Sequence, residues 1–222
     1  REGALITVYG RATSSNVQIV MWAIAELGLA HKRLDYGHVH GGVDTDEYRA
    51  LNPNGLVPTI RDRRGGDDVV LWESAAILRY LADRYGEPPF RPADPARRAR
   101  LDMWAEWTKS TFVPAFNLAI FWPLIRTPKA DRDDAALAAA VEALKPIARR
   151  LDERLGEGPW LDGAAFTFAD VMTGHTLFRY FTVPIERAET PALDAYYARL
   201  RDRPTYREHV MVSYEPLRAE GA

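Results

Sequence analysis

The pattern of apolar and polar residues near the start of the chain predicts a strand followed by a helix. Residues 5–9 are rich in β-branched and aromatic side chains, which favour a strand. Three residues that commonly cap helices follow at 14–16. The apolar residues behind them recur at helical spacing until Gly28, a typical helix stop; they are Val17, Val20, Met21, Ile24 and Leu27.

Further strands and helices are predicted before residue 87. A weaker strand is expected at 34–39, and a short helix is expected from residue 44 or 45 to about 51. Clearer strands are expected at 56–60 and 69–72, with Gly65-Gly66 suited to the hairpin between them.

A helix that begins at Glu73-Ser74 and ends at Gly86 completes this region. The resulting order is strand, helix, strand, helix, strand, strand, helix. This order predicts an α/β domain with a mixed sheet.

The character of the chain changes at Glu87. Four prolines crowd residues 87–95, which is incompatible with regular helix or a central strand and is typical of a linker. The pattern after it is helical, with a helix around 101–111 and a long one at 137–155 that we expect to be kinked or divided at Pro146. Thr167–Asp170 forms a capping box in which Asp replaces the usual Glu, and shorter helices are expected at 193–200 and 206–210.

Composition narrows the function classes. The net charge is −2 and both signs are interspersed, which argues against a protein that binds nucleic acid or a membrane surface. No apolar run approaches the roughly 20 residues that cross a bilayer, and we expect no secretory leader. Cysteine is absent, so the protein has no disulfide, thiolate metal site or thiol nucleophile of its own, and a reducing cytoplasm is the simplest location.

The motifs taken together resemble the glutathione S-transferase family. They are the first strand, the Ser/Asn-rich helix start, Asn52-Pro53-Asn54-Gly55-Leu56-Val57-Pro58, Glu73-Ser74-Ala75-Ala76-Ile77, the proline-rich linker and the Thr167–Asp170 box. The stretch Gly10-Arg11-Ala12-Thr13-Ser14-Ser15-Asn16-Val17 is most similar to bacterial members of the theta and nu type.

This resemblance implies a fold and an assembly. The fold is a thioredoxin-like N-terminal domain with a mixed four-stranded sheet, followed by an all-α C-terminal helical domain. The expected boundaries are 1–86 for the glutathione-binding domain, 87–95 for the linker and 96–222 for the helical domain. The resemblance also implies a homodimer that acts in detoxification.

Glutathione is an extended tripeptide, so its backbone needs a strand-like partner. Val57-Pro58 fits this need: in the family the bond is cis, and the residue before the proline pairs with the cysteinyl amide. The alternative is an edge strand that contains an incidental proline.

The α-carboxylate and α-ammonium of the γ-glutamyl end need a second set of partners. Glu73-Ser74 fits, because unpaired N–H groups at a helix start favour a carboxylate and Glu73 accepts hydrogen bonds from the ammonium. Ordinary N-capping is the alternative. The two roles are compatible, since they use different atoms of the same turn.

The sulfur needs a hydrogen-bond donor. Ser14 aligns best with the sulfur-facing serine of the theta-like pattern, whereas the nu-like pattern also indicates Asn16. No tyrosine lies in this helix start, which disfavours the tyrosine-dependent classes. Ser15 is expected to be structural, and in the alternative interpretation all three residues only cap the helix.

The remaining candidates concern the electrophile pocket and the glycine carboxylate. One or two of the aromatic residues at 104–122 are expected to line the electrophile pocket, with Trp107 and Phe112 as candidates, although core packing is the usual role of such residues. Arg126 is a candidate contact for an anionic substrate or glutathione, with a solvated arginine as the alternative. His40 is a candidate contact for the glycine carboxylate, and His38 with His40 is too small a set for a metal site.

The sequence therefore predicts an enzyme that binds glutathione as co-substrate, without a metal, and conjugates it to a small electrophile. Two alternatives remain open: a glutathione-dependent disulfide or peroxide reductase, and a non-catalytic glutathione-binding module. The identity of the electrophile does not follow from the fold.

Overall fold

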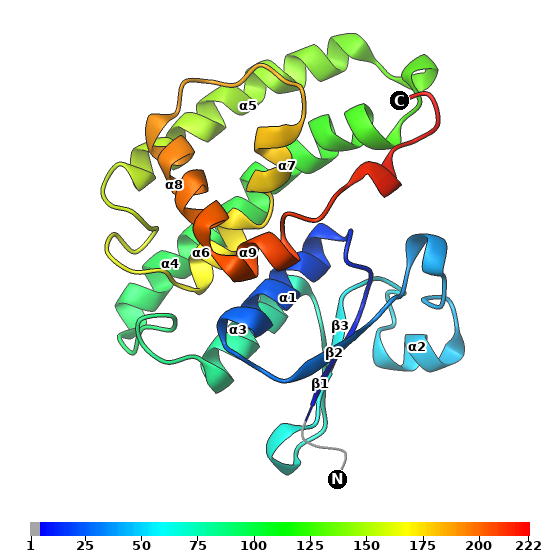
Figure 1. The fold of residues 1–222 in the computed structure, drawn as a ribbon, viewed down its shortest axis with the longest axis vertical. Coiled ribbons are helices and arrows are strands. Elements are labelled where there is room, and N and C mark those ends of the chain that lie inside the picture. The colour runs from blue at the N-terminus through cyan, green and yellow to red at the C-terminus, as the bar shows by residue number, and fades with distance from the viewer. Residues whose placement is uncertain (1–4) are drawn as a thin grey trace.

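A computed structural model describes residues 5–222 and shows a small sheet domain joined to a helical domain (Figure 1). The sheet has the strand order β2-β1-β3-β4. Strand β1 (Ile6–Tyr9) pairs in parallel with β2 (His31–Leu34) and antiparallel with β3 (Thr59–Asp62), which pairs antiparallel with β4 (Val69–Trp72). The expected mixed four-stranded sheet is therefore confirmed.

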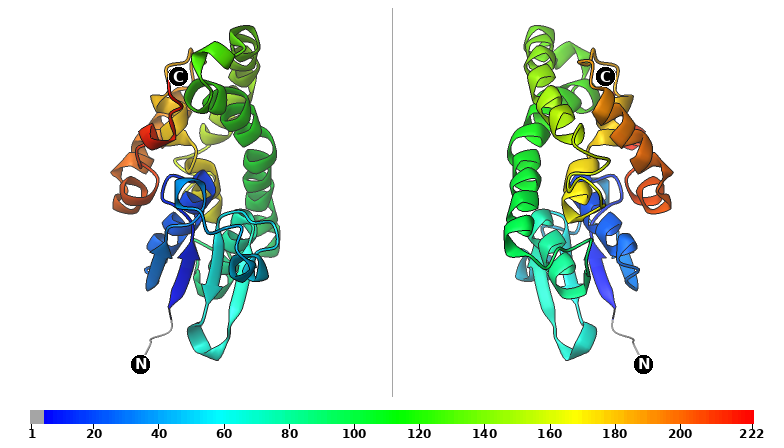
Figure 2. Two further views of the ribbon diagram at one scale, coloured as in Figure 1. Left: turned by 90° about the vertical axis from the view of Figure 1, so that its right-hand side faces the viewer. Right: turned by 90° about the vertical axis from the view of Figure 1, so that its left-hand side faces the viewer.

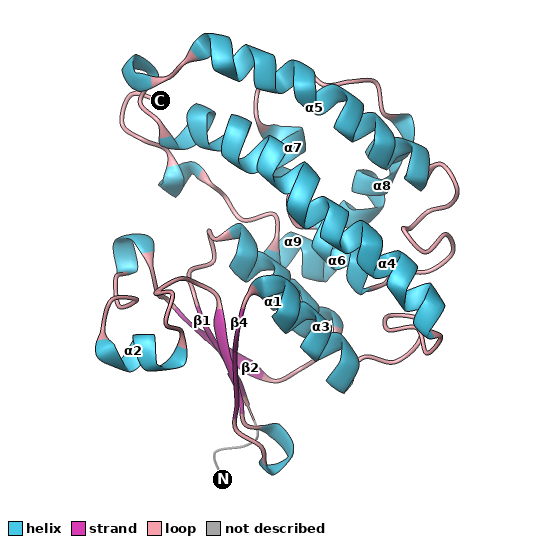
Figure 3. Cartoon of the chain, turned by 180° about the vertical axis from the view of Figure 1, so that it is seen from behind, coloured by secondary structure: helices cyan, strands magenta, loops and turns pink. Residues whose placement is uncertain are grey.

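Helices cover both faces of this sheet. Helices α1 (Ser15–Glu26) and α3 (Ser74–Tyr85) lie side by side between the sheet and the helical domain, while α2 (Asp46–Leu51) lies on the opposite side (Figures 1 and 3). All eight residues of the stretch 17–24 in α1 are buried. A helix at the edge of a domain buries only one stripe, so this complete burial reflects packing against elements of both domains.

The helical domain lies beyond α1 and α3 (Figure 2). It begins with α4 (Pro95–Trp107) and continues through two π-helical stretches, Thr108–Phe112 and Pro114–Arg126. The remaining helices are α5 (Asp134–Leu155), α6 (Phe168–Gly174), α7 (Leu177–Thr182), α8 (Pro191–Asp202) and α9 (Pro204–His209).

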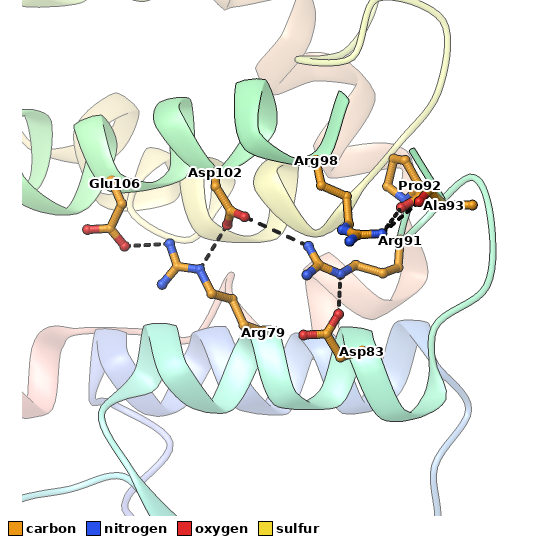
Figure 4. Close-up of polar contacts among 8 residues, drawn as sticks. All are labelled: Arg79, Asp83, Arg91, Pro92, Ala93, Arg98, Asp102 and Glu106. Atoms are coloured by element: carbon orange, nitrogen blue, oxygen red, sulfur yellow. Dashed lines mark hydrogen bonds and ion pairs between the residues drawn. The ribbon is translucent and has the colours of Figure 1, made fainter. Parts of the chain in front are cut away.

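Charged residues connect α3 to α4 and the linker (Figure 4). Arg79 on α3 donates to Asp102 at 2.8 Å and to Glu106, both on α4. Arg91 of the linker donates to Asp83 of α3 at 2.6 Å and lies 3.9 Å from Asp102. Partly exposed ion pairs stabilise a fold only modestly. Their contribution here is to orient the two domains, whose junction holds the candidate site.

Two expectations for the sheet domain need correction. The second strand is His31–Leu34 and not 34–39, where His38–His40 forms a short 3₁₀ turn. Its residues are largely charged because it is an edge strand that alternates between half-buried and exposed positions. The third strand begins at Thr59 and not at Leu56, since Pro58 has no N–H with which to pair.

The helical domain also differs in detail. Helix α5 runs through Pro146 without division. The segment that follows α4 is π-helical over much of residues 108–126, where the sequence predicts a helix only to about 111. The capping box is confirmed: Asp170 Oδ2 accepts hydrogen bonds from Thr167 N at 2.7 Å and from Thr167 Oγ1 at 3.1 Å.

Candidate active site

Two adjoining cavities lie where the sheet domain meets the helical domain. The smaller measures about 70 Å³ and is lined by residues that include Asn52, Asn54, Pro58, Trp72, Glu73 and Ser74. The larger measures about 280 Å³ and is lined by residues that include Arg11, Thr13, Ser14, Phe121, Trp122, Arg126 and Arg179. Asn16, Leu56 and Val57 line both, so these three residues mark the boundary between the cavities.

The Val57–Pro58 bond at this boundary is cis. Within residues 5–222, the backbone N–H and C=O of Val57 have no hydrogen-bond partner. The preceding carbonyl of Leu56 accepts hydrogen bonds from two side chains that were not predicted from the sequence, Tyr48 Oη at 2.7 Å and Asn52 Nδ2 at 2.9 Å. The loop is thus anchored while the backbone of Val57 is left available to an extended ligand.

The start of α3 is open to an anion. Glu73 has φ 69° and ψ 109° and its side chain does not cap the helix. The first helical bond runs from Ile77 N to Glu73 O, so the N–H groups of residues 74–76 precede it and have no intrahelical partner. The Glu73 carboxylate is exposed and pairs with Lys109 of the helical domain at 3.1 Å. This turn therefore offers donors for a carboxylate and an acceptor for a cation.

Ser14 and Asn16 stand beside the start of α1. Ser14 is the N-cap and is only 8% exposed, and its Oγ accepts from Val17 N at a long 3.5 Å. Among the described residues its hydroxyl has no acceptor, so the proton is free for a ligand. Asn16 Oδ1 accepts from Ser74 Oγ at 3.2 Å, which links the two helix starts and leaves the Asn16 Nδ2 hydrogens available.

Three arginines reach the larger cavity from different elements. Arg11 lies in the loop between β1 and α1, Arg126 ends the second π-helical stretch and Arg179 lies on α7. Arg179 is only 4% exposed, and its Nη2 donates to Thr13 O at 2.7 Å. Burial, followed by the charges of Arg11 and Arg126, lowers the pKa of Arg179 to about 10.

Of these three arginines, only Arg126 was predicted from the sequence. Arg11 lies within the motif that carries the family resemblance, three residues before Ser14, and this position could have indicated it. No local signal indicated Arg179, because it lies 168 positions from Arg11 and only the fold brings the two together.

The aromatic lining comes from Phe121 and Trp122. Trp107 and Phe112, the two candidates named from the sequence, do not line either cavity. Phe112 is fully buried in the core, and Trp107 packs on it with ring centroids 6.4 Å apart. The helical path through residues 108–126 decides which aromatics face the cavity, and spacing along the sequence does not reveal that path.

His40 also lies outside the residues that line the two cavities. It sits in the 3₁₀ turn, and its Nε2 is 3.9 Å from Asp35 Oδ1. Its contact with the glycine carboxylate stays a prediction.

Two further findings concern the described residues as a whole. Residues 5–222 contain no cluster of three or more His, Asp or Glu side chains arranged to hold a metal ion. Within the same range, every helix is too short or too polar to cross a membrane.

Comparisons with known proteins agree with this geometry. The family models of the glutathione S-transferase N-terminal and C-terminal domains match residues 13–84 and 134–199. Glutathione S-transferase GstB of Escherichia coli K12 is 35% identical over 94% of this chain and 99% of its own length. The chain therefore belongs to the glutathione S-transferase family, and its enzymatic class is glutathione transferase.

Comparison with solved structures shows which class of the family the chain is similar to. The theta class glutathione S-transferase from the citrus canker pathogen Xanthomonas axonopodis pv. citri, with glutathione bound, superimposes with a TM-score of 0.87 at 45% identity. The match covers 95% of this chain and 99% of that one. The apo form of the same enzyme gives a TM-score of 0.79 at 40% identity, with coverage of 94% and 97%. The expected family, fold class and similarity to the theta class are confirmed.

Proposed function

We propose that this protein binds glutathione across the two cavities, stabilises its thiolate and conjugates it to a small electrophile. The observation that carries the proposal is the continuity of the site. An uncapped helix start in the smaller cavity leads, through Asn16 and Val57, to a larger cavity that contains Ser14. A tripeptide with an anionic end and a central thiol matches this arrangement.

The smaller cavity would hold the γ-glutamyl end. The N–H groups at the start of α3 donate to its α-carboxylate, and the Glu73 carboxylate accepts from its ammonium. The Ser74 hydroxyl donates to the same carboxylate once it turns away from Asn16 Oδ1. The free backbone groups of Val57 pair with the cysteinyl residue. These assignments direct the thiol toward the boundary of the two cavities.

At that boundary the sulfur would receive a hydrogen bond from Ser14 or Asn16. Serine is a far weaker acid than a thiol, so Ser14 does not act as a base. It donates to the sulfur once the proton has left, and this favours the thiolate. The electrophile then approaches from the larger cavity, alongside Phe121 and Trp122.

The test is a comparison of substrates. Retention on glutathione resin tests binding, and turnover of chlorodinitrobenzene with glutathione tests conjugation. Faster turnover of a mixed disulfide than of chlorodinitrobenzene would assign the protein to disulfide reduction, in which a second glutathione supplies the second thiol. Failure to bind the resin would leave only a module that has lost the site.

We also propose that the protein works as a cytoplasmic homodimer in detoxification. The family resemblance supports the homodimer and the role in detoxification. The absence of cysteine supports a reducing cytoplasm. Trp72 and Met103, which are 40% and 59% exposed, are apolar surface that a second copy would cover. Sedimentation velocity tests the assembly: a single species at the mass of one chain would contradict it.

A further inference from the structure

The larger cavity is unusual in its charge. Arg11, Arg126 and Arg179 all line it, and none of them lies within 4 Å of a carboxylate among the described residues. Some other arginines pair with carboxylates, such as Arg79 with Asp102, and others, such as Arg149, are exposed and have no such partner among the described residues. This cavity differs because three arginines without a carboxylate partner line the same space and one of them, Arg179, is only 4% exposed.

Placing these charges together opposes folding. A buried arginine is normally paired, because removing its charge from water is costly. Arg179 is nearly inaccessible and Nε of Arg11 is buried with no hydrogen-bond partner. The charge of Arg126 adds to the effect of burial in lowering the pKa of Arg11.

Contacts within the fold occupy only some of the donors of these three arginines. Arg179 has a structural role, since it donates to Thr13 O and its guanidinium lies 4.6 Å from the ring centroid of Phe121. Its Nε and Nη1, like Nε of Arg11, make no hydrogen bond within residues 5–222. Arg126 makes none either and lies over the ring of Trp122 at 4.7 Å. An anion in the cavity would meet donors from three elements at once.

We propose that the electrophile conjugated by this enzyme carries a carboxylate, which Arg11, Arg126 and Arg179 bind. A guanidinium presents its donors in a planar fork that matches a carboxylate. The 280 Å³ cavity accommodates a small aromatic or aliphatic acid beside the aromatic rings of Phe121 and Trp122. This inference rests on the proposed function, because it assigns the larger cavity to the electrophile.

Glutathione itself has other anionic groups, and the experiment must separate them from the electrophile. The α-carboxylate is assigned to the start of α3, in the other cavity. The glycine carboxylate and the thiolate remain as competing partners for the arginines. Either of them would make the arginines important for every substrate, whereas an anionic electrophile makes them important only for acids.

A matched pair of probes isolates the carboxylate: 4-chloro-3-nitrobenzoate and the neutral 4-chloro-3-nitrobenzamide. With either probe the thiol loses its proton to solvent and the thiolate sulfur bonds to the carbon that bears chlorine. The carbon–chlorine bond then breaks, and chloride leaves with the electron pair. The products are S-(4-carboxy-2-nitrophenyl)glutathione and the corresponding 4-carbamoyl conjugate.

Calorimetry with the two purified conjugates tests recognition without requiring turnover. We expect the wild-type protein to bind the carboxy conjugate at least about tenfold more tightly than the carbamoyl conjugate, as a charge-assisted hydrogen bond implies. Arg126→Gln and Arg11→Gln should each remove most of this preference and leave the affinity for the carbamoyl conjugate within about twofold. Arg126→Lys should retain part of the preference, because it keeps the charge but not the planar fork.

Arg63→Gln is the matched control. It removes one positive charge from an exposed arginine of the β3–β4 turn, 3.6 Å from Asp68, and should leave the preference intact. Equal affinity of the wild-type protein for the two conjugates would overturn the inference. An equal loss for both conjugates in Arg126→Gln would also overturn it, since that result assigns the arginine to glutathione.

Turnover separates this inference from the proposed function. The kcat/KM for each probe is divided by the rate constant of its uncatalysed reaction with glutathione. The normalised value should favour the acid by about tenfold or more. Turnover of the amide with no preference for the acid refutes the anion site and leaves the transferase function standing. Absence of turnover with both probes and with chlorodinitrobenzene refutes the proposed conjugation, and the calorimetry still decides the anion site.

Discussion

Replacing Ser14 with alanine tests how the protein activates the thiol. A cysteine thiol has an unperturbed pKa of about 8.5. A hydrogen bond from Ser14 to the thiolate is expected to contribute about 1.5–3 kcal/mol, which is roughly one to two pKa units. The N-terminus of the 12-residue helix α1 adds up to about one further unit. Together these place the pKa of bound glutathione near ~6.5.

The loss of conjugation rate in Ser14→Ala should depend on pH. If Ser14→Ala raises the thiol pKa by about one unit, the thiolate fraction at pH ~6.5 falls from about one half to about one tenth. The conjugation rate should then fall about fivefold at that pH and recover toward wild type near pH ~9. Glutathione affinity should change less, because the γ-glutamyl contacts are retained.

The structure also bounds the effect on stability. Ser14 caps α1 through a bond of 3.5 Å to Val17 N, so we expect a cost near the lower end of the usual range of about 0.5–2 kcal/mol. Ser15→Ala is the matched control: Ser15 lines the same cavity, and among the described residues its hydroxyl makes no hydrogen bond. It should leave the kinetic pKa unchanged.

The assay is the pH dependence of conjugation, together with the ultraviolet absorbance of the bound thiolate. If Ser14→Ala changes neither the pKa nor the rate at low pH, Ser14 is only a helix cap. If Asn16→Ala raises the pKa and Ser14→Ala does not, the Asn16 amide faces the sulfur.

Three further predictions concern binding and stability. Glu73→Gln with Ser74→Ala should weaken glutathione binding about tenfold or more while the melting temperature is kept, and unchanged affinity by calorimetry would remove the γ-glutamyl assignment. Asp170→Ala should cost about 3 kcal/mol or more in denaturant unfolding, because Leu161 N and Tyr196 Oη, each 3.0 Å from Oδ1, lose their acceptor; specific activity per folded molecule should persist. Burial lowers the pKa of His175 from 6.5 to about 4. The contribution of neutral His175 to stability is therefore present above pH ~6.5 and is lost as the pH falls toward ~4. The total loss should be about 3 kcal/mol. His175→Gln should flatten this slope in urea unfolding measured between those pH values, and an unchanged slope would show that other groups cause it.

Local signals predicted the elements that depend on local physics. The helix starts at 14–16 and at 44 or 45 and the Thr167–Asp170 box were visible from the sequence, because a cap is decided by neighbouring residues. The order of strands and helices followed from periodicity in the same way. The second strand was misplaced because its edge position leaves little apolar pattern to detect.

The candidate site also contains residues selected from the sequence and contacts that only the structure shows. Val57, Pro58, Glu73 and Ser74, which the family resemblance selects, line the smaller cavity, and Asn16 lines both cavities. Their contacts with glutathione stay a prediction. The pairing of Asn16 with Ser74, 58 residues apart, was not foreseen, since only the packing of α1 against α3 brings the two helix starts together.

The amino-acid sequence by itself determined the caps, the turns and the run of strands and helices, since each depends on residues close together in the chain. Its composition also excluded any cysteine chemistry of the protein's own. Only the tertiary structure decided the composition of the larger cavity. Phe121 and Trp122 line it while Phe112 is in the core, because the π-helical path sets which side chains face the junction. Arg11 and Arg179 line the same cavity because the fold brings Arg179 of α7 within hydrogen-bond distance of Thr13 O, just before the start of α1. A cluster of like charges from distant segments leaves no local signal, since it forms only when the domains close on each other.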